Sequence, residues 1–292
     1  MSIPSIKNKS RWNALLAGLT IAAVSGAFVP SALAATFVLD FDKGADGGEV
    51  LTKSNGAIDT TQWADWGLEK IFGRNNRTKQ HAKFMTYDTI VAGGRDSDLE
   101  TGSDWGTPEQ GNVLIIQEED NKNKNLFASN GVYTPDDEAG GGKVNFKFTD
   151  TVAFKSFSLL DIDDNGGGIR IKGFDADNQK VLDINVDALI AEHKAVNGRN
   201  AAAAQGTSVT MNGVTLTQVG NTHGDNSLFR FDINEAYLAK VRFDYPGSGA
   251  IAGLEWSNGD EPEKVPEPSV MGGLLMLGFV GTRKYLKAQQ SA

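Results

Sequence analysis

Short β-rich runs separated by Gly, Asp and Asn recur along most of this chain and restrict its fold more than any other feature. Within them apolar and polar residues alternate, as in a strand with one buried and one solvated face. Asn212-Gly213 joins two runs and predicts a hairpin, because this dipeptide tolerates positive φ at both central positions. The predicted strands are 36–42, 83–87, 112–117, 143–149, 154–162, 168–175, 180–186, 208–211, 214–219, 227–233, 239–245 and 250–256. The pattern predicts an all-β fold, an antiparallel, jelly-roll-like β-sandwich.

One helical segment interrupts this pattern. Asp187 is a candidate N-cap for a helix over 187–196, with Leu189, Ile190 and His193 on one side. Residues 201–204 predict a further helical turn. We therefore expect one short helical insertion between strands, besides signal and anchor helices at the chain ends.

The first 34 residues have the three parts of a secretory signal peptide. Lys7, Lys9 and Arg11 supply the positive charge, residues 14–29 are apolar, and Ala32-Leu33-Ala34 forms an A-x-A cleavage site. Cleavage by signal peptidase after Ala34 would export the remainder of the chain.

The C-terminal end carries a second targeting pattern. Pro266-Glu267-Pro268 precedes an uncharged apolar run over 270–281, and Arg283 and Lys284 follow it. The run is shorter than the roughly 20 residues of a spanning helix, although an ordinary C-terminal membrane helix is the alternative. The cations favour the cytoplasmic side.

This tail resembles the PEP-CTERM sorting signal of Gram-negative bacteria. The resemblance covers 265–292 and implies transient anchoring in the inner membrane, followed by cleavage by an exosortase-type enzyme. The middle of the chain also resembles exported PEP-CTERM proteins of undefined function, in residues 96–99, 111–118, 159–164, 224–227 and 247–251. The resemblance implies a secreted β-sandwich at the cell surface or in the extracellular matrix, with no established activity. The domain is expected over 35–257, and 258–264 form a linker.

The exported region is strongly acidic. The whole chain carries −9, and removing the three cations of the signal peptide and the three cations and Glu267 of the tail leaves −14 for 35–264. Nucleic acid is therefore not an expected partner, because its phosphates require a basic face. The chain has no cysteine, so disulfides and zinc–thiolate sites are excluded, and bound Ca²⁺ is a candidate stabiliser.

Asp161-Ile162-Asp163-Asp164-Asn165-Gly166 matches the first six positions of a calcium loop, in which alternate oxygens converge. The twelfth position is Lys172 instead of Glu, and a strand is predicted before the motif, so it is not an EF-hand. Asp161, Asp163 and Asn165 remain candidate Ca²⁺ ligands in a looser loop. The alternative is a tight turn whose side chains bond the local backbone.

A second acidic set is dispersed over several loops. If 112–117 is a central strand, its neighbouring loops could bring carboxylates together around a cation. The alternative is a set of separate solvated loops. The candidates for this second set are Asp96, Asp98, Glu118, Asp136 and Asp137.

Trp63, Trp66 and Trp105 are candidates for a sugar-stacking platform, since sugar rings present apolar faces that pack on indole. Buried tryptophans that close the ends of a sandwich are the alternative.

Enzyme signatures are scarce: none of the three histidines has H-E-x-x-H spacing, and Gly247-Ser248-Gly249 is not a nucleophile elbow. The leading expectation is an exported, surface- or matrix-associated, non-enzymatic sandwich stabilised by Ca²⁺, with extracellular polysaccharide as a candidate partner. A carbohydrate-binding module is the first alternative. A secreted glycan-active hydrolase is the second, and it would require a concave site with two convergent carboxylates, one of raised pKa.

Overall fold

A computed structural model describes residues 34–90, 96–119, 134–162 and 167–259. All strands that pair with one another do so antiparallel, which confirms the predicted all-β antiparallel sandwich. The strands are β1 (Thr36–Leu39), β2 (Leu68–Asn75), β3 (Phe84–Asp88), β4 (Asn112–Ile116), β5 (Gly142–Leu160), β6 (Arg170–Phe174), β7 (Lys180–Asn185), β8 (Ser208–Met211), β9 (Val214–Gln218), β10 (Leu228–Tyr245) and β11 (Ala250–Asn258). The helical elements are η1 (Ala64–Trp66), η2 (Ser97–Leu99), α1 (Val186–Asn197) and α2 (Ala201–Ala204).

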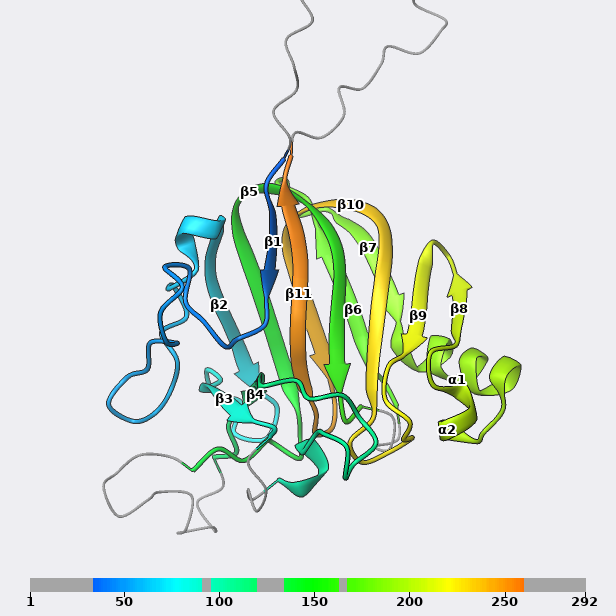
Figure 1. The fold of residues 1–292 in the computed structure, drawn as a ribbon. Coiled ribbons are helices and arrows are strands. Elements are labelled where there is room, and N and C mark those ends of the chain that lie inside the picture. Colours follow the sequence, from blue (N-terminus) through cyan, green and yellow to red (C-terminus); the bar gives the residue numbers. More distant parts are fainter. Residues whose placement is uncertain (1–33, 91–95, 120–133, 163–166, 260–292) are drawn as a thin grey trace, which may run out of the picture. The chain divides into compact units, whose positions relative to one another are not determined.

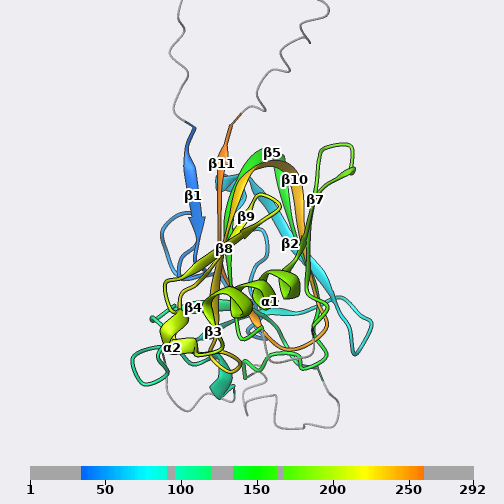
Figure 2. The ribbon, with the colours of Figure 1, turned by 90° about the vertical axis from the view of Figure 1, so that its right-hand side faces the viewer.

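Two long strands, β5 and β10, each pass through both layers of the sandwich. The first part of β5 pairs with β2 and its last part with β11. The first part of β10 pairs with β9 and its last part with β6. Both strands arch over one end of the sandwich, and register shifts in β10 mark its crossing (Figures 1 and 2).

One layer therefore runs β8-β9-β10-β5-β11, with β1 and the β4-β3 pair beside β11. The other layer runs β2-β5-β10-β6-β7. Figure 2 shows the two layers from the side, with β1 on the left and β2 and β7 on the right.

The core between the layers is rich in aromatic rings. Phe157 stacks on Phe231 at 4.7 Å and meets Phe243 edge-on at 5.2 Å, and all three rings are almost completely buried. Phe157 and Phe231 belong to the layer that contains β11, whereas Phe243 belongs to the layer that contains β2. These rings thus join the two layers by burial of large apolar surfaces.

The helical insertion is confirmed between β7 and β8, but its N-cap differs from the prediction. Asn185 caps α1 by accepting a hydrogen bond from the Ala188 backbone N–H. The Asp187 carboxylate instead accepts the backbone N–H of Gly168, on the loop before β6. Asp187 was the wrong choice because Val186, which the sequence assigned to the strand, is already helical and buried.

Residues 34 and 259 lie next to each other at the end where β5 and β10 arch. β1 pairs with the end of β11, and the Asn258 N–H donates to the Ala35 carbonyl at 3.2 Å. Apart from Ala34, the predicted signal peptide lies outside the described residues, as does the whole predicted sorting signal, including Pro266, Glu267, Pro268, Arg283 and Lys284. None of the helices within the described ranges is long and apolar enough to cross a bilayer.

Candidate functional site: a buried carboxylate cluster

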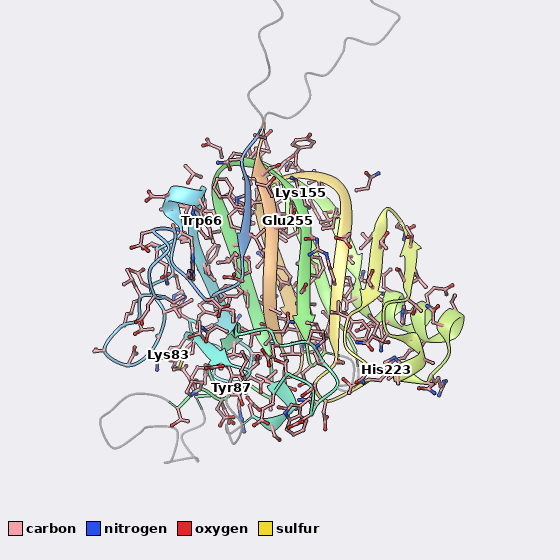
Figure 3. All side chains as sticks on the ribbon, in the orientation of Figure 1. Trp66, Lys83, Tyr87, Lys155, His223 and Glu255 are labelled. Atoms are coloured by element: carbon pink, nitrogen blue, oxygen red, sulfur yellow. The ribbon has the colours of Figure 1, made fainter. Side chains whose placement is uncertain are left out.

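Four acidic side chains gather at the end of the sandwich opposite to residues 34 and 259. We call Asp96, Asp98, Asp137 and Asp161 the carboxylate cluster. Asp161 follows the last residue of β5, Leu160, which pairs with the first residues of both β10 and β11. Asp137 lies between β4 and β5, and Asp96 and Asp98 belong to the segment around η2. Figure 3 places Tyr87, which contacts this segment, far from Lys155 and Glu255 at the other end.

Direct hydrogen bonds connect Asp96, Asp137 and the loop before β11. The backbone N–H of Asp137 donates to Asp96 Oδ2 at 2.6 Å, and the backbone N–H of Gly249 donates to Asp137 Oδ2 at 2.5 Å. The Tyr87 hydroxyl donates to the backbone carbonyl of Asp96 at 2.8 Å. These bonds join the segments that carry the two carboxylates.

The turn before β10 holds the segments of the cluster together. The backbone N–H of Asn226 donates to the Asp98 carbonyl at 2.8 Å, and its side-chain amide donates to the Ser97 and Glu100 carbonyls. The backbone N–H of Asp161 donates to the Ser227 carbonyl at 2.8 Å. Asp161 and Asn226 both have positive φ, 54° and 63°, a conformation that Asp and Asn tolerate better than most residues.

Burial places these carboxylates in an unfavourable electrostatic environment. Asp96, Asp137 and Asp161 expose 8%, 7% and 0% of their surfaces. Burial, together with the negative charges of Asp137 and Asp98, raises the pKa of Asp96 to about 9. Burial also raises the pKa of Asp137 to about 7, with contributions from Asp98 and Asp161 and against the hydrogen bond from Gly249. Such carboxylates take up protons unless a cation neutralises them.

These shifts predict an unusual pH dependence in a chelating buffer. In the unfolded chain an aspartate ionises near pH 4, whereas Asp137 and Asp96 in the fold hold protons up to about pH 7 and pH 9. Between these limits the native state binds more protons, so the free energy of unfolding should fall as the pH rises. Urea unfolding from pH 5 to 9 tests this expectation.

The chosen pH range avoids an opposing effect. The pKa values of Asp59, Glu69 and Asp183 are lowered, chiefly by hydrogen bonds to the carboxylates, so these groups add stability that is lost only as the pH falls through their acidic titration range. If the free energy of unfolding rose between pH 5 and 9 without calcium, the raised pKa values of Asp96 and Asp137 would be contradicted.

The structure brings together only part of the predicted ligand set. Asp96, Asp98 and Asp161 lie close enough to Asp137 to affect its pKa, although the sequence placed Asp161 in a separate local loop. Glu118 forms an ion pair with Arg77 at 2.7 Å, and its backbone N–H donates to the Asp136 carbonyl. Neither Glu118 nor Asp136 is among the main causes of the raised pKa values of Asp96 and Asp137. Asp163 and Asn165 lie outside the described residues.

Sequence reasoning missed Asn226, Ser227 and Gly249 as supports of this cluster. Asn226 and Ser227 belong to a resemblance segment, Gly224-Asp225-Asn226-Ser227, but the sequence gave no reason to place them beside Asp98 and Asp161. A Cβ on Gly249, which has φ 129°, would lie 2.8 Å from the Asp161 carbonyl oxygen. Gly249 therefore permits the close approach that brings its N–H to Asp137.

The described residues contain no group of three or more Asp, Glu or His side chains that is arranged to hold a metal ion as it stands. A cation in the carboxylate cluster would require side-chain rotations that turn more oxygens toward a common centre.

The three predicted indoles do not form one exposed platform. Trp63 is fully buried, packs edge-on against Phe41 and donates its indole N–H to the Lys43 carbonyl. Trp66 stacks with Phe37 at a ring-centroid distance of 6.1 Å. Figure 3 places Trp66 in the half of the sandwich that also holds Lys155. Trp105 is 37% exposed, on a loop whose Gly106 carbonyl accepts the Asn221 N–H near the start of β10.

The described residues thus define an antiparallel β-sandwich with buried carboxylates at one end. Comparisons of the chain with protein-family models, with curated proteins and with solved structures find no match. Its function is therefore inferred from its own residues.

Proposed function

We propose that this protein is an exported, non-enzymatic β-sandwich of the cell surface or extracellular matrix, stabilised by Ca²⁺ at the carboxylate cluster. The observation that carries the calcium part is the burial of Asp96, Asp137 and Asp161 in one place with raised pKa values for the first two. A divalent cation would replace the protons and remove the repulsion between the carboxylates.

The available ligand chemistry favours Ca²⁺ over other common metals. The cluster offers carboxylate and backbone carbonyl oxygens, which Ca²⁺ accepts in variable number and geometry. Zinc prefers thiolate and imidazole ligands. The chain has no cysteine to supply a thiolate. The buried imidazole of His193 belongs to the helical insertion, where its Nε2 is 3.0 Å from Thr207 Oγ1, and not to the carboxylate cluster. The flexible coordination of Ca²⁺ also suits a cluster that must adjust its side chains.

Export is supported by the two targeting patterns in the sequence. Signal peptidase would cleave after Ala34, and an exosortase-type enzyme would act near Pro266-Glu267-Pro268 after transient inner-membrane anchoring in a Gram-negative bacterium. Residues 34 and 259 leave the sandwich side by side, at the end away from the carboxylate cluster. An anchor attached there would leave the outer faces of both layers accessible.

A structural role for the carboxylates fits their surroundings better than hydrolysis. Asp96 and Asp137 are a close acidic pair with raised pKa values, but each exposes less than a tenth of its surface. In the described part of the chain, neither carboxylate lines the three clefts to which Tyr237, His223 and Phe72 respectively belong. A glycosidase needs its two carboxyl groups on either side of an accessible sugar.

Calcium titration followed by thermal melting tests the proposal. With Ca²⁺ about a hundredfold above its Kd, binding should add about 2.7 kcal/mol, which raises the Tm of a domain of this size by about 5–10 °C. Because binding competes with protons, the increase should be larger at pH 8 than at pH 5. An equal response to Mg²⁺, or an unchanged Tm at millimolar Ca²⁺, would contradict the proposal.

A further inference from the structure

The outer face of one layer is strongly cationic although the protein is acidic overall. In three rows across β2, β5, β10 and β6, directly paired residues share this face. The rows are Lys70, Lys147, Lys240 and Phe174; Phe72, Asn145, Arg242 and Lys172; and Arg74, Lys143, Asp244 and Arg170. Eight of these twelve positions are Lys or Arg, and one is acidic. We call these twelve residues the cationic face; it lies on the side of β2 and β7 in Figure 2.

The intervening residues of the same strands point into the core, so the charge pattern follows from strand alternation. Ile71, Val144, Phe146, Val241 and Phe243 alternate with the cationic positions and are nearly or fully buried. The charge segregation is therefore fixed by the rigid sheet and does not depend on loop conformation.

Nearby carboxylates neutralise only part of this charge. Asp244 is shared by Lys143 and Lys172, and Glu69 is shared by Lys70 and Lys147. Asp183, at the neighbouring edge, is shared by Arg170 and Lys180.

Three cations of the face have neutral hydrogen-bond partners. Arg74 donates to the Lys79 carbonyl, Lys240 to Asn178 Oδ1 and Arg242 to Asn145 Oδ1. Within the described parts of the chain, no carboxylate lies within ion-pair distance of these three side chains. Burial, and then the positive charges of Arg242 and Lys147, lower the pKa of Lys240. Positive charges on this face therefore repel one another.

A cleft of about 410 Å³ opens on the cationic face. Arg74, Lys143 and Arg242 line it together with Lys79 and His81 from the loop after β2. Phe72, on the edge strand β2, also lines the cleft and is 39% exposed. The cleft thus combines several hydrogen-bond donors of positive charge with one accessible aromatic ring.

We propose that the cationic face binds an acidic polysaccharide, with the cleft around Phe72 holding one of its sugar residues. Arginine guanidinium groups pair with carboxylates through two parallel hydrogen bonds, and the ring of Phe72 can pack against the apolar face of a sugar. The choice of an extracellular polyanion rests on the proposed export. The proposed function left the polysaccharide partner and its binding site unspecified. The cationic face gives that partner a negative charge and a place on the protein.

Other polyanions fit this face less well. Single-stranded nucleic acid binds through several exposed aromatic rings on which successive bases stack. Phe72 is 39% exposed, with Lys70 Nζ over its ring at 5.7 Å from the centroid. Phe174 is covered more closely, by Lys240 at 4.3 Å and Arg242 at 5.3 Å. An anionic membrane surface would attract the cations but would make no use of a cleft. Both remain as outcomes of the test.

The test measures binding of the purified protein to polygalacturonate in calcium-free buffer, with neutral dextran, duplex DNA and anionic phospholipid vesicles as comparisons. The double variant Arg74→Glu/Lys240→Glu removes two cations that have no carboxylate partner. Binding to polygalacturonate should weaken at least about tenfold and should also fall steeply with added salt. The matched control Lys53→Glu/Arg199→Glu changes the net charge equally at exposed positions outside the face and should bind like the unaltered protein.

Equal weakening in both double variants would overturn the proposal, because net charge rather than the cationic face would then govern binding. Absence of binding to polygalacturonate, or tighter binding to DNA or vesicles, would overturn the ligand assignment. The calcium-dependent Tm increase of Arg74→Glu/Lys240→Glu should remain unchanged. Failure of the cationic face and failure of the calcium proposal are therefore distinguishable.

Discussion

Replacing Asp96 and Asp137 together by asparagine is expected to stabilise the calcium-free protein at pH 8 and to abolish its response to calcium. At this pH the unfolded chain has both carboxylates ionised in water, whereas the folded chain must either protonate them or bury their charges. An amide of nearly the same shape removes that penalty and still accepts the hydrogen bonds from Asp137 N–H and Gly249 N–H. The gain should be at least about 1 kcal/mol, because one unit of pKa shift corresponds to about 1.4 kcal/mol.

Urea unfolding with and without calcium measures both parts of this prediction. The double variant Asp104→Asn/Asp150→Asn is a matched control, because it removes the same charge at two exposed positions. It should retain the calcium response and change stability by less than about 0.5 kcal/mol. A calcium response that survives in Asp96→Asn/Asp137→Asn would place the ion elsewhere.

Replacing Phe157 by alanine is expected to destabilise the protein by about 3–5 kcal/mol. Phe157 contacts Phe231 of its own layer and Phe243 of the opposite layer, so its removal leaves a cavity where the two layers join. For a domain of this size, the loss corresponds to a fall in Tm of about 6–20 °C. Thermal melting in excess calcium measures this effect independently of the carboxylates.

Phe72→Ala is the control for this prediction, because it removes the same ring from an exposed strand position. Its cost should stay below about 1 kcal/mol. Similar losses for Phe157→Ala and Phe72→Ala would contradict the assignment of Phe157 to the joint between the layers.

Strand positions could largely be predicted from the sequence. β9 alternates between buried and partly exposed residues, and β4 is a short apolar run that is almost entirely buried. β2 was missed because a register shift between Leu68 and Lys70 breaks its alternation. β5 and β10 were each predicted as two strands. Polar residues such as Asp150 and Asn234 suggested turns there. In the structure both residues are exposed to solvent and lie within the continuous strands, where these cross from one layer to the other.

The carboxylate cluster could be predicted only in part, because it is assembled by pairing of segments distant in sequence. Nothing local to Asp161 indicates that the end of β5 lies beside Asp137 and Gly249. Glu118 was a reasonable candidate until its partner Arg77, 41 positions earlier, could be placed. The negative net charge likewise gave no indication of a cationic face. Strand alternation and cross-strand register decide which side of the sheet each Lys or Arg occupies, and the net charge contains neither.

Calorimetric titration of the chelator-treated protein with CaCl₂ near pH 7, in two buffers of different ionisation enthalpy, tests the calcium assignment most directly. We predict binding of about one Ca²⁺ per chain with proton release, seen as a difference in heat between the buffers, because Ca²⁺ must displace protons from Asp96 and Asp137. Absence of binding heat in both buffers, or binding that releases no protons, would contradict a calcium site built from these buried carboxylates.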